Sequence, residues 1–258
     1  MTTFVKVNTI VVYPHKIWIT YENLNNGKTM KFTIVNAGKA KATTHINCLI
    51  YGESGSGKSF LAASAPRPLI LLTEPNGQTS IMHSNPQADL IHITDIRMLS
   101  NILKSLKEEP KTWAKYDTLV IDSLTEVQRM CKDELTNQGR KQMQLQDWGK
   151  LADYMRRIIR TLRQIEKHIV CLALLETTFE EGSGTRHLRP SFEGKKTSSE
   201  IAQFFNFVGF LYTQILEQKT HRFLMLEGND RVLCKPTFPL TGTIKNPNIT
   251  ALFKEISK

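Results

Sequence analysis

The sequence predicts an α/β protein with a mainly parallel central sheet flanked by helices, preceded by a small N-terminal β-rich extension. Three observations lead to this fold class. From about His45 onward, short apolar runs alternate with segments of helical periodicity, which is typical of parallel sheets. One of these runs leads into a glycine-rich loop that opens a helix. Before His45 the chain instead contains successive strand-like runs.

The first 42 residues are expected to form the β-rich extension. Their Val-, Ile-, Thr- and aromatic-rich runs are separated by turn-forming residues, including the hairpin signal Asn25-Asn26-Gly27. A linker-like segment follows at 36–41, so we predict one domain over 1–42 and a second over 43–258. The predicted strands of the extension are Phe4 to Tyr13, Ile17 to Tyr21 and Met30 to Val35.

The second domain is predicted to contain strands separated by helices. Asp95 is placed to cap a helix over 96–106, and another helix is expected at 124–135. The longest helix is predicted from Leu145 to Lys167, with Trp148 on its apolar face and therefore in the core rather than stacked on a base. The five predicted parallel strands are 46–51, 68–73, 89–93, 117–122 and 168–175.

The C-terminal part is less regular. Residues 177–200 show no periodicity and contain Gly182-Ser183-Gly184, so we expect a long loop, a feature that is usually either functional or disordered. The segments that follow are apolar runs at 204–216 and 223–226, a strand near Val232 to Cys234 and a terminal helix over 249–256.

Composition narrows the partners and the compartment. The 34 basic and 24 acidic residues give a formal net charge of +10, which favours a polyanionic partner. The four cysteines form no Cys-x-x-Cys pair, which argues against a zinc site or a disulfide framework and favours a reducing compartment. No apolar stretch approaches a membrane span, and the N-terminus does not resemble a signal peptide. We therefore expect a cytoplasmic protein without a membrane partner.

The most specific signal is the phosphate-binding loop, G-x-x-x-x-G-K-[ST]. A predicted strand precedes it and Phe60 begins a helix behind it, so the context fits the motif. Glycines let backbone N–H groups turn towards phosphate oxygens, Lys58 reaches the β- and γ-phosphates, and the Ser59 hydroxyl can bind Mg²⁺. The motif predicts binding of a nucleoside triphosphate, ATP with Mg²⁺, by Gly52, Glu53, Ser54, Gly55, Ser56, Gly57, Lys58, Ser59 and Phe60.

Carboxylates end three of the predicted strands, at the sheet edge where ligands bind. Asp122 would lie beside Ser59 and hold Mg²⁺ directly or through water, although it could also simply cap the next helix. Glu74 would polarise the water that attacks the γ-phosphate, with a turn residue as the alternative. Glu176 is a candidate for sensing the γ-phosphate and signalling to the 177–200 segment.

The order of these features resembles the RecA-like recombinase core, and most closely the phage-encoded ATPases related to single-strand annealing proteins. The resemblance covers about residues 44–258, but the extension and the absence of a clear Phe-x-x-Ala motif depart from it. The segments that carry it are 52–59, Leu72-Thr73-Glu74-Pro75-Asn76-Gly77, Val120-Ile121-Asp122-Ser123-Leu124-Thr125, Gln146-Asp147-Trp148-Gly149 and Pro190-Ser191-Phe192-Glu193-Gly194-Lys195.

This resemblance implies an ATPase that acts in recombination or annealing, is stimulated by single-stranded DNA and assembles with itself as a ring or filament. A single-strand-binding protein is a further implied partner, and a phage-encoded protein would act in the host cytoplasm. Glu74 would be the activating carboxylate, and Lys235 would be supplied to the γ-phosphate of a neighbouring subunit. The cations implied to contact DNA, unless they are merely solvated loop residues, are Arg186, Arg189, Lys195 and Lys196.

Two other functions fit the same phosphate-binding loop. An ATP-dependent loader or regulatory ATPase would use its nucleotide state to switch a contact with a helicase, a polymerase or another replication protein. A nucleotide or small-molecule kinase would close an arginine-rich lid over the phosphates, whereas the late segment here has mixed charge. DNA-dependent turnover, partner binding or phosphate transfer to a nucleotide would separate the three.

Overall fold

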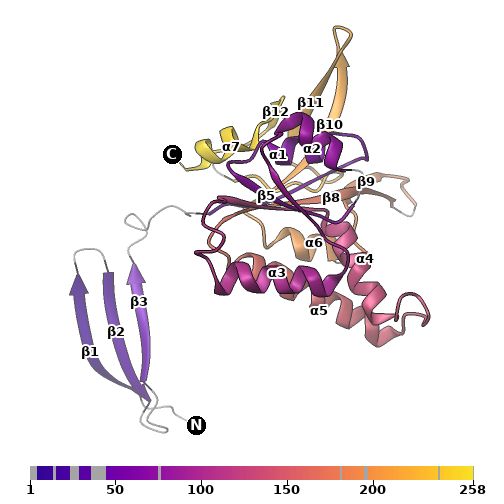
Figure 1. Cartoon of the computed structure of the whole chain (residues 1–258). Helices are drawn as coiled ribbons and strands as arrows, with labels where there is room; N and C mark the ends of the chain where they lie inside the picture. The colour runs from indigo at the N-terminus through magenta and orange to yellow at the C-terminus, as the bar shows by residue number, and fades with distance from the viewer. Residues whose placement is uncertain are drawn as a thin grey trace. The chain divides into compact units, whose positions relative to one another are not determined.

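The computed structural model describes residues 5–13, 16–23, 29–35, 45–74, 77–180, 182–194, 197–237 and 239–257. The chain divides into two compact units, Met1–Thr44 and His45–Lys258 (Figure 1). The first unit is a three-stranded antiparallel sheet in the order β1-β2-β3, so the strands predicted for the extension are confirmed. The predicted Asn25-Asn26-Gly27 turn lies outside the described residues. These strands are β1 (Val5–Tyr13), β2 (Lys16–Asn23) and β3 (Thr29–Val35).

The second unit is built on a nine-stranded sheet in the order β12-β11-β10-β4-β8-β7-β5-β6, with β9 paired to β8. All neighbours from β10 to β6 along this order are parallel. The predicted α/β class with a mainly parallel sheet is therefore confirmed. Its strands are β4 (Asn47–Gly52), β5 (Pro68–Leu72), β6 (Asp89–His92), β7 (Thr118–Asp122), β8 (His168–Phe179), β9 (Arg186–Pro190), β10 (Phe207–Leu216), β11 (Lys219–Met225) and β12 (Thr243–Lys245).

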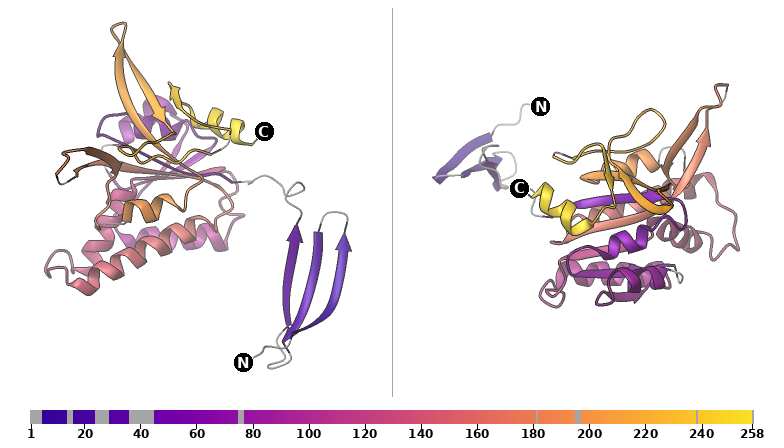
Figure 2. Two further views of the ribbon diagram at one scale, coloured as in Figure 1. Left: turned by 180° about the vertical axis from the view of Figure 1, so that it is seen from behind. Right: turned by 90° about the horizontal axis from the view of Figure 1, so that it is seen from above.

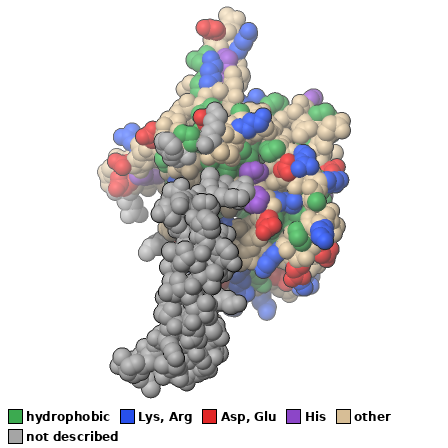
Figure 3. Space-filling model, turned by 90° about the vertical axis from the view of Figure 1, so that its left-hand side faces the viewer, with side chains coloured by type: hydrophobic (Ala, Val, Ile, Leu, Met, Phe, Trp, Pro, Cys, Tyr) green, Lys and Arg blue, Asp and Glu red, His purple; other side chains and the backbone are tan. Residues whose placement is uncertain are grey.

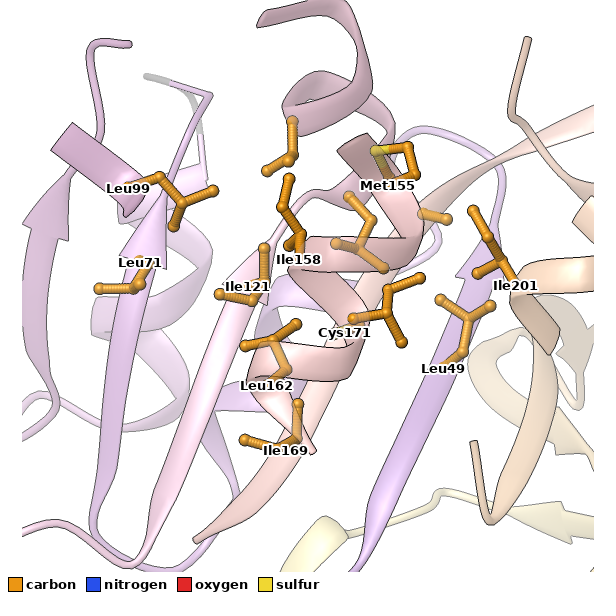
Figure 4. Packing of buried hydrophobic residues seen from close by; sticks show 14 of the residues in the cluster. Leu49, Leu71, Leu99, Ile121, Met155, Ile158, Leu162, Ile169, Cys171 and Ile201 are labelled. Atoms are coloured by element: carbon orange, nitrogen blue, oxygen red, sulfur yellow. The ribbon is translucent and has the colours of Figure 1, made fainter. Parts of the chain in front are cut away.

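Helices cover both faces of this sheet (Figures 1 and 2). Alternate residues of each strand point to opposite faces, so in β4 Leu49 packs under one layer of helices and Ile50 under the other. Figure 4 shows the first of these cores, where Met155 and Ile158 meet the sheet. One face carries α3 (Ile96–Glu108), α4 (Leu124–Leu135), α5 (Leu145–Leu162) and α6 (Thr197–Ala202), and the other α1 (Lys58–Ala63), α2 (Gln78–Ser84) and α7 (Ile249–Ile256).

The start of α5 differs from the prediction. Trp148 is 39% exposed and Leu145 is 89% exposed, so the expectation that Trp148 lies in the core is wrong. The buried residues of the helix begin at Leu151, one turn later. The first turn therefore carries apolar side chains without burying them, and the ammonium of Lys132 lies 5.8 Å from the Trp148 ring centre.

The prediction of one long loop at 177–200 is also wrong in part, because β8, β9 and α6 together cover half of this segment. Strand β8 continues to Phe179 and pairs with β9 in an antiparallel hairpin, with Glu176 opposite Arg189. Side chains on this hairpin are mostly half-exposed on both faces, so it lacks the apolar alternation that reveals a strand in a sequence. The strand expected near Val232 forms only isolated bridges among the described residues.

The hairpin formed by β10 and β11 extends away from the sheet (Figures 1 and 2). Its turn, Glu217-Gln218, has two consecutive residues with φ of 51° and 61°, a geometry that suits the twist of a tight hairpin. Within the part of the chain that the structure describes, no helix is both long and apolar enough to cross a membrane.

Candidate functional site

The phosphate-binding loop connects β4 to α1 at the carboxyl edge of the parallel sheet. Gly55 and Gly57 have φ of 80° and 90°, which is the left-handed region that glycine adopts without strain. The Ser56 N–H donates to the Glu53 carbonyl at 3.2 Å, so the loop curls back on itself. The first N–H groups of α1 have no acceptors within the helix. In phosphate-binding loops these groups point into the space that the loop encloses.

Lys58 lies inside this loop with only 8% of its surface exposed. Its Nζ donates to the carbonyl oxygens of Gly52 at 3.0 Å and Glu53 at 2.8 Å. Burial lowers the pKa of Lys58, while the charges of Asp122 and Glu74 act in the opposite direction. An ammonium has three donors, so one remains for a ligand even in this arrangement.

Ser59 and Asp122 meet at the predicted metal position. The Ser59 hydroxyl donates to Asp122 Oδ2 at 2.6 Å, and Asp122 is only 6% exposed. Burial raises the pKa of Asp122; nearby Glu74 raises it further, while the Ser59 hydrogen bond and Lys58 lower it. A side chain on Gly77 would overlap Leu72 Cδ1 and lie 3.3 Å from Asp122 Oδ2, so glycine lets the backbone approach this pair closely.

These two oxygen groups fit Mg²⁺, which prefers hydroxyl and carboxylate oxygens and retains several water ligands. Among the described residues there is no group of three or more His, Cys, Asp or Glu side chains suited to a metal. A magnesium ion at Ser59 and Asp122 would therefore take its remaining ligands from water and from the phosphates of a bound nucleotide.

Glu74 is held beside this pair by residues that the sequence analysis did not single out. Ser123 Oγ donates to Glu74 Oε1 at 2.7 Å. The Thr73 hydroxyl accepts from Ser123 N at 2.8 Å and donates to the Asp122 carbonyl at 2.9 Å, which ties the ends of β5 and β7 together. The structure thus brings Lys58, at the start of α1, close to Asp122 and Glu74, at the ends of β7 and β5.

Glu176 has a different neighbour. Its carboxylate accepts from Arg189 Nε at 3.0 Å across the β8–β9 hairpin, so two residues predicted to bind different ligands are paired with each other. A cavity of about 390 Å³ lies beside the phosphate-binding loop. The β8–β9 hairpin contributes Leu175, Arg186 and Leu188 to the lining of this cavity, whereas Glu176 and Arg189 do not line it.

The remaining predicted cations are distributed as follows. Arg186 lines the cavity beside the loop and donates to Thr177 Oγ1 at 3.4 Å. Lys195 and Lys196 lie outside the described residues. Lys235 donates to the carbonyl oxygens of Gln203 at 3.3 Å and Phe205 at 2.5 Å within its own chain. The predicted roles of all four stay predictions.

A set of contacts links α4 to the segment that follows β9. Gln128 donates to the Glu193 carbonyl at 3.0 Å and accepts from Glu193 N at 2.7 Å. Lys132 Nζ donates to both carboxylate oxygens of Glu193, at 2.9 and 2.7 Å. Because α4 begins directly after Ser123, this segment is connected through one helix to the group that binds Glu74.

Arg222 was also missed. It comes from β11, far along the chain, and its guanidinium carbon lies 4.6 Å from the centre of the Phe60 ring. A side chain on Gly57 would overlap the Arg222 Nε atom. No sequence signal marks this arginine, because only the pairing of β10 with β4 brings the hairpin to the loop.

Comparison with known proteins gives a family and two similar structures. A family model described as AAA domain matches residues 44–238. A KaiC-like protein from Pyrococcus horikoshii is 11% identical, with a TM-score of 0.44 over 78% of this chain and 83% of that chain. The flagellar accessory protein FlaH from Methanocaldococcus jannaschii is 13% identical, with a TM-score of 0.42 over 82% and 90% of the two chains. No match was found among curated proteins.

Proposed function

This chain belongs to the AAA domain family of P-loop ATPases, and on that premise we propose that it hydrolyses ATP in response to single-stranded DNA during recombination or annealing. The observation that carries the hydrolysis is the cluster in which Ser59 contacts Asp122 and Ser123 contacts Glu74. In this proposal Ser59 and Asp122 are the metal-binding pair and Glu74 is the activating carboxylate. The two hydrogen bonds support it because they gather these side chains beside the phosphate-binding loop.

Each residue of the cluster has a separate task. Lys58 exchanges its bonds to the loop carbonyls for the β- and γ-phosphate oxygens. Ser59 and Asp122 hold the magnesium ion, which neutralises charge on the phosphates. Glu74 accepts a hydrogen bond from the attacking water and orients it towards the γ-phosphate. Ser123 keeps the Glu74 carboxylate in place through its 2.7 Å hydrogen bond.

The proposed role of DNA is supported by charge and by connectivity. The net charge of +10 suits a polyanion, and Arg186 lies on the cavity beside the loop. Glu193 contacts α4, and α4 begins directly after Ser123, which binds Glu74. DNA bound near residues 193–196 would therefore affect the position of Glu74 through this helix. On the face in Figure 3, acidic and basic side chains are interspersed.

Self-assembly into a ring or filament is part of the same proposal, with Lys235 acting on a neighbouring subunit's γ-phosphate. For that action, Lys235 would have to release the Gln203 and Phe205 carbonyls. A single-strand-binding protein is a proposed additional partner. We propose that the protein acts in the cytoplasm, which is the host cytoplasm if a phage encodes it.

A second candidate is an ATP-dependent loader of a replication protein, and exposed apolar side chains at two hairpins favour it. Phe179 is 68% exposed on the β8–β9 hairpin, and Ile215 is 76% exposed on the β10–β11 hairpin. Large apolar residues at projecting tips suit a protein partner better than a nucleic-acid backbone.

The test is steady-state ATP turnover with and without single-stranded DNA, at low and moderate salt, with Lys58→Ala as the blank. Stimulation that fades with salt is expected, because contacts with DNA phosphates release counterions. Turnover that ignores DNA would reject the DNA role and favour the loader. Phosphate transfer to a nucleoside monophosphate would instead identify the kinase alternative, and full turnover by Lys58→Ala would reject the ATPase site itself.

A further inference from the structure

Arg222 occupies an unusual position for an arginine. Strand β11 carries it to the phosphate-binding loop, where it lies against Gly57 and over Phe60, with its guanidinium carbon 4.6 Å from the ring centre. The hydrogen atom of Gly57 makes room for it, because a methyl group there would lie 3.1 Å from the guanidinium carbon and would overlap Nε. An element outside the motif thus supplies a cation to the motif.

The Nε of this guanidinium is buried without a hydrogen bond among the described residues. A buried donor without an acceptor is costly, and a guanidinium offers five donors in a fixed planar arrangement. The backbone of Arg222, in contrast, is held in place, because the Asn246 N–H donates to the Arg222 carbonyl at 2.7 Å.

We propose that Arg222 binds the phosphate chain of the nucleotide held by the same subunit, as a second cation opposite Lys58. This inference rests on the proposed function, since it needs a nucleotide in the loop. Guanidinium and phosphate form strong, paired hydrogen bonds, so phosphate is the acceptor that this arginine lacks. Gly57 and Phe60 border the part of such loops that holds the α- and β-phosphates, so the contact serves ADP as well as ATP.

The contact would also make the motion of the β10–β11 hairpin depend on whether a nucleotide is bound. Arg222 lies opposite Thr213 in this hairpin, and its tip carries the exposed Ile215. A phosphate bound by Arg222 ties β11 to the loop and restricts the motion of the hairpin. The nucleotide would thus influence a surface that is distinct from the β8–β9 hairpin.

The experiment measures the affinities of the full chain for fluorescent ATP and ADP analogues. The variants are Arg222→Met, which keeps the apolar stem over Phe60, and Arg222→Lys, which keeps the charge but loses the planar fork. Lys219→Met is the matched control, because it removes one exposed positive charge from the same strand. Thermal unfolding establishes that each variant is folded, and Lys58→Ala tests the nucleotide site independently.

We expect Arg222→Met to lower the affinity for both ATP and ADP by about 10- to 100-fold, the usual effect of losing a charge-assisted hydrogen bond. Arg222→Lys should recover part of this loss, and Lys219→Met should bind as the unchanged chain does. Hydrogen exchange of residues 213–222 should slow on ADP binding in the unchanged chain but not in Arg222→Met.

Unchanged or tighter binding by folded Arg222→Met would overturn the proposal, since it would make Arg222 a neutral or blocking residue. A loss for ATP without a loss for ADP would also overturn it, because the contact would then involve the γ-phosphate. If Lys58→Ala binds nucleotide normally, the proposed function itself fails. If only Lys58→Ala loses binding, the ATPase site stands and the role of Arg222 alone is rejected.

Discussion

Ser123 holds Glu74 through a 2.7 Å hydrogen bond between its hydroxyl and Glu74 Oε1. The same hydroxyl accepts from the Glu126 N–H at 3.3 Å and so caps α4. One serine therefore joins the predicted activating carboxylate to the first turn of a helix. A movement of α4 would change the orientation of Glu74, which gives the site a physical means of regulation.

Glu74→Gln should retain ATP binding but lower hydrolysis by about 10²- to 10⁴-fold, the usual effect of removing a general base. Ser123→Ala should lower kcat less and leave KM unchanged, because Glu74 keeps its charge but loses its orientation. Single-turnover hydrolysis and nucleotide affinity separate the two effects. Ser100→Ala on α3 is the control, and a normal rate for Glu74→Gln would remove Glu74 from the mechanism.

The Lys132–Glu193 pair should carry the effect of DNA to the site. Lys132→Met or Glu193→Gln should leave basal turnover intact and lower DNA stimulation by about 2- to 30-fold, the range of a typical coupling energy. The measurement is the ratio of ATP turnover with and without single-stranded DNA. Arg129→Met breaks the exposed Arg129–Glu126 pair on the same helix and serves as control. Equal stimulation in all variants would reject this route.

Lys235→Met should have two separable effects. Loss of the bonds to Gln203 and Phe205 should lower the free energy of unfolding by about 1 kcal/mol in the monomer. If Lys235 also acts on a neighbour, hydrolysis should fall only at concentrations where the assembled state is populated. Turnover measured against protein concentration, beside the mass of the assembly, decides this. An equal loss in the isolated monomer would contradict a role between subunits.

His168 should make stability depend on pH. Its Nδ1 accepts from the Ile46 N–H at 3.0 Å, and burial, aided by His45, lowers its pKa. The unfolded state then binds the proton more readily, so stability is complete above the ordinary histidine pKa of about 6.5 and declines as the pH falls below it. His168→Asn, which keeps an acceptor but does not titrate, should lose less stability.

Thermal unfolding between about pH 7 and pH 5 tests this expectation, because histidine changes charge in that range. The control is His83→Asn, which removes an exposed histidine on α2. If His168→Asn and the unchanged chain lose stability in parallel, another group is responsible for the acid sensitivity.

Local patterns were sufficient for the regular part of the fold. The strands before Gly52, Glu74 and Asp122 lie where their apolar runs predicted them, because a fully buried strand needs apolar residues on both faces. The β8–β9 hairpin was missed because its half-exposed faces leave no such pattern, and Trp148 was misplaced because periodicity does not reveal where a neighbouring layer ends.

The sequence by itself determined the phosphate-binding loop and the strand-end carboxylates, because a loop motif and its flanking strand are contiguous in the chain. Only the tertiary structure decided which groups surround them. Sheet order set β7 beside β5, which brought Ser123 to Glu74, and β10 beside β4, which brought Arg222 to Gly57. Such contacts depend on strand pairing between distant segments, and pairing leaves no local mark on the residues that it brings together.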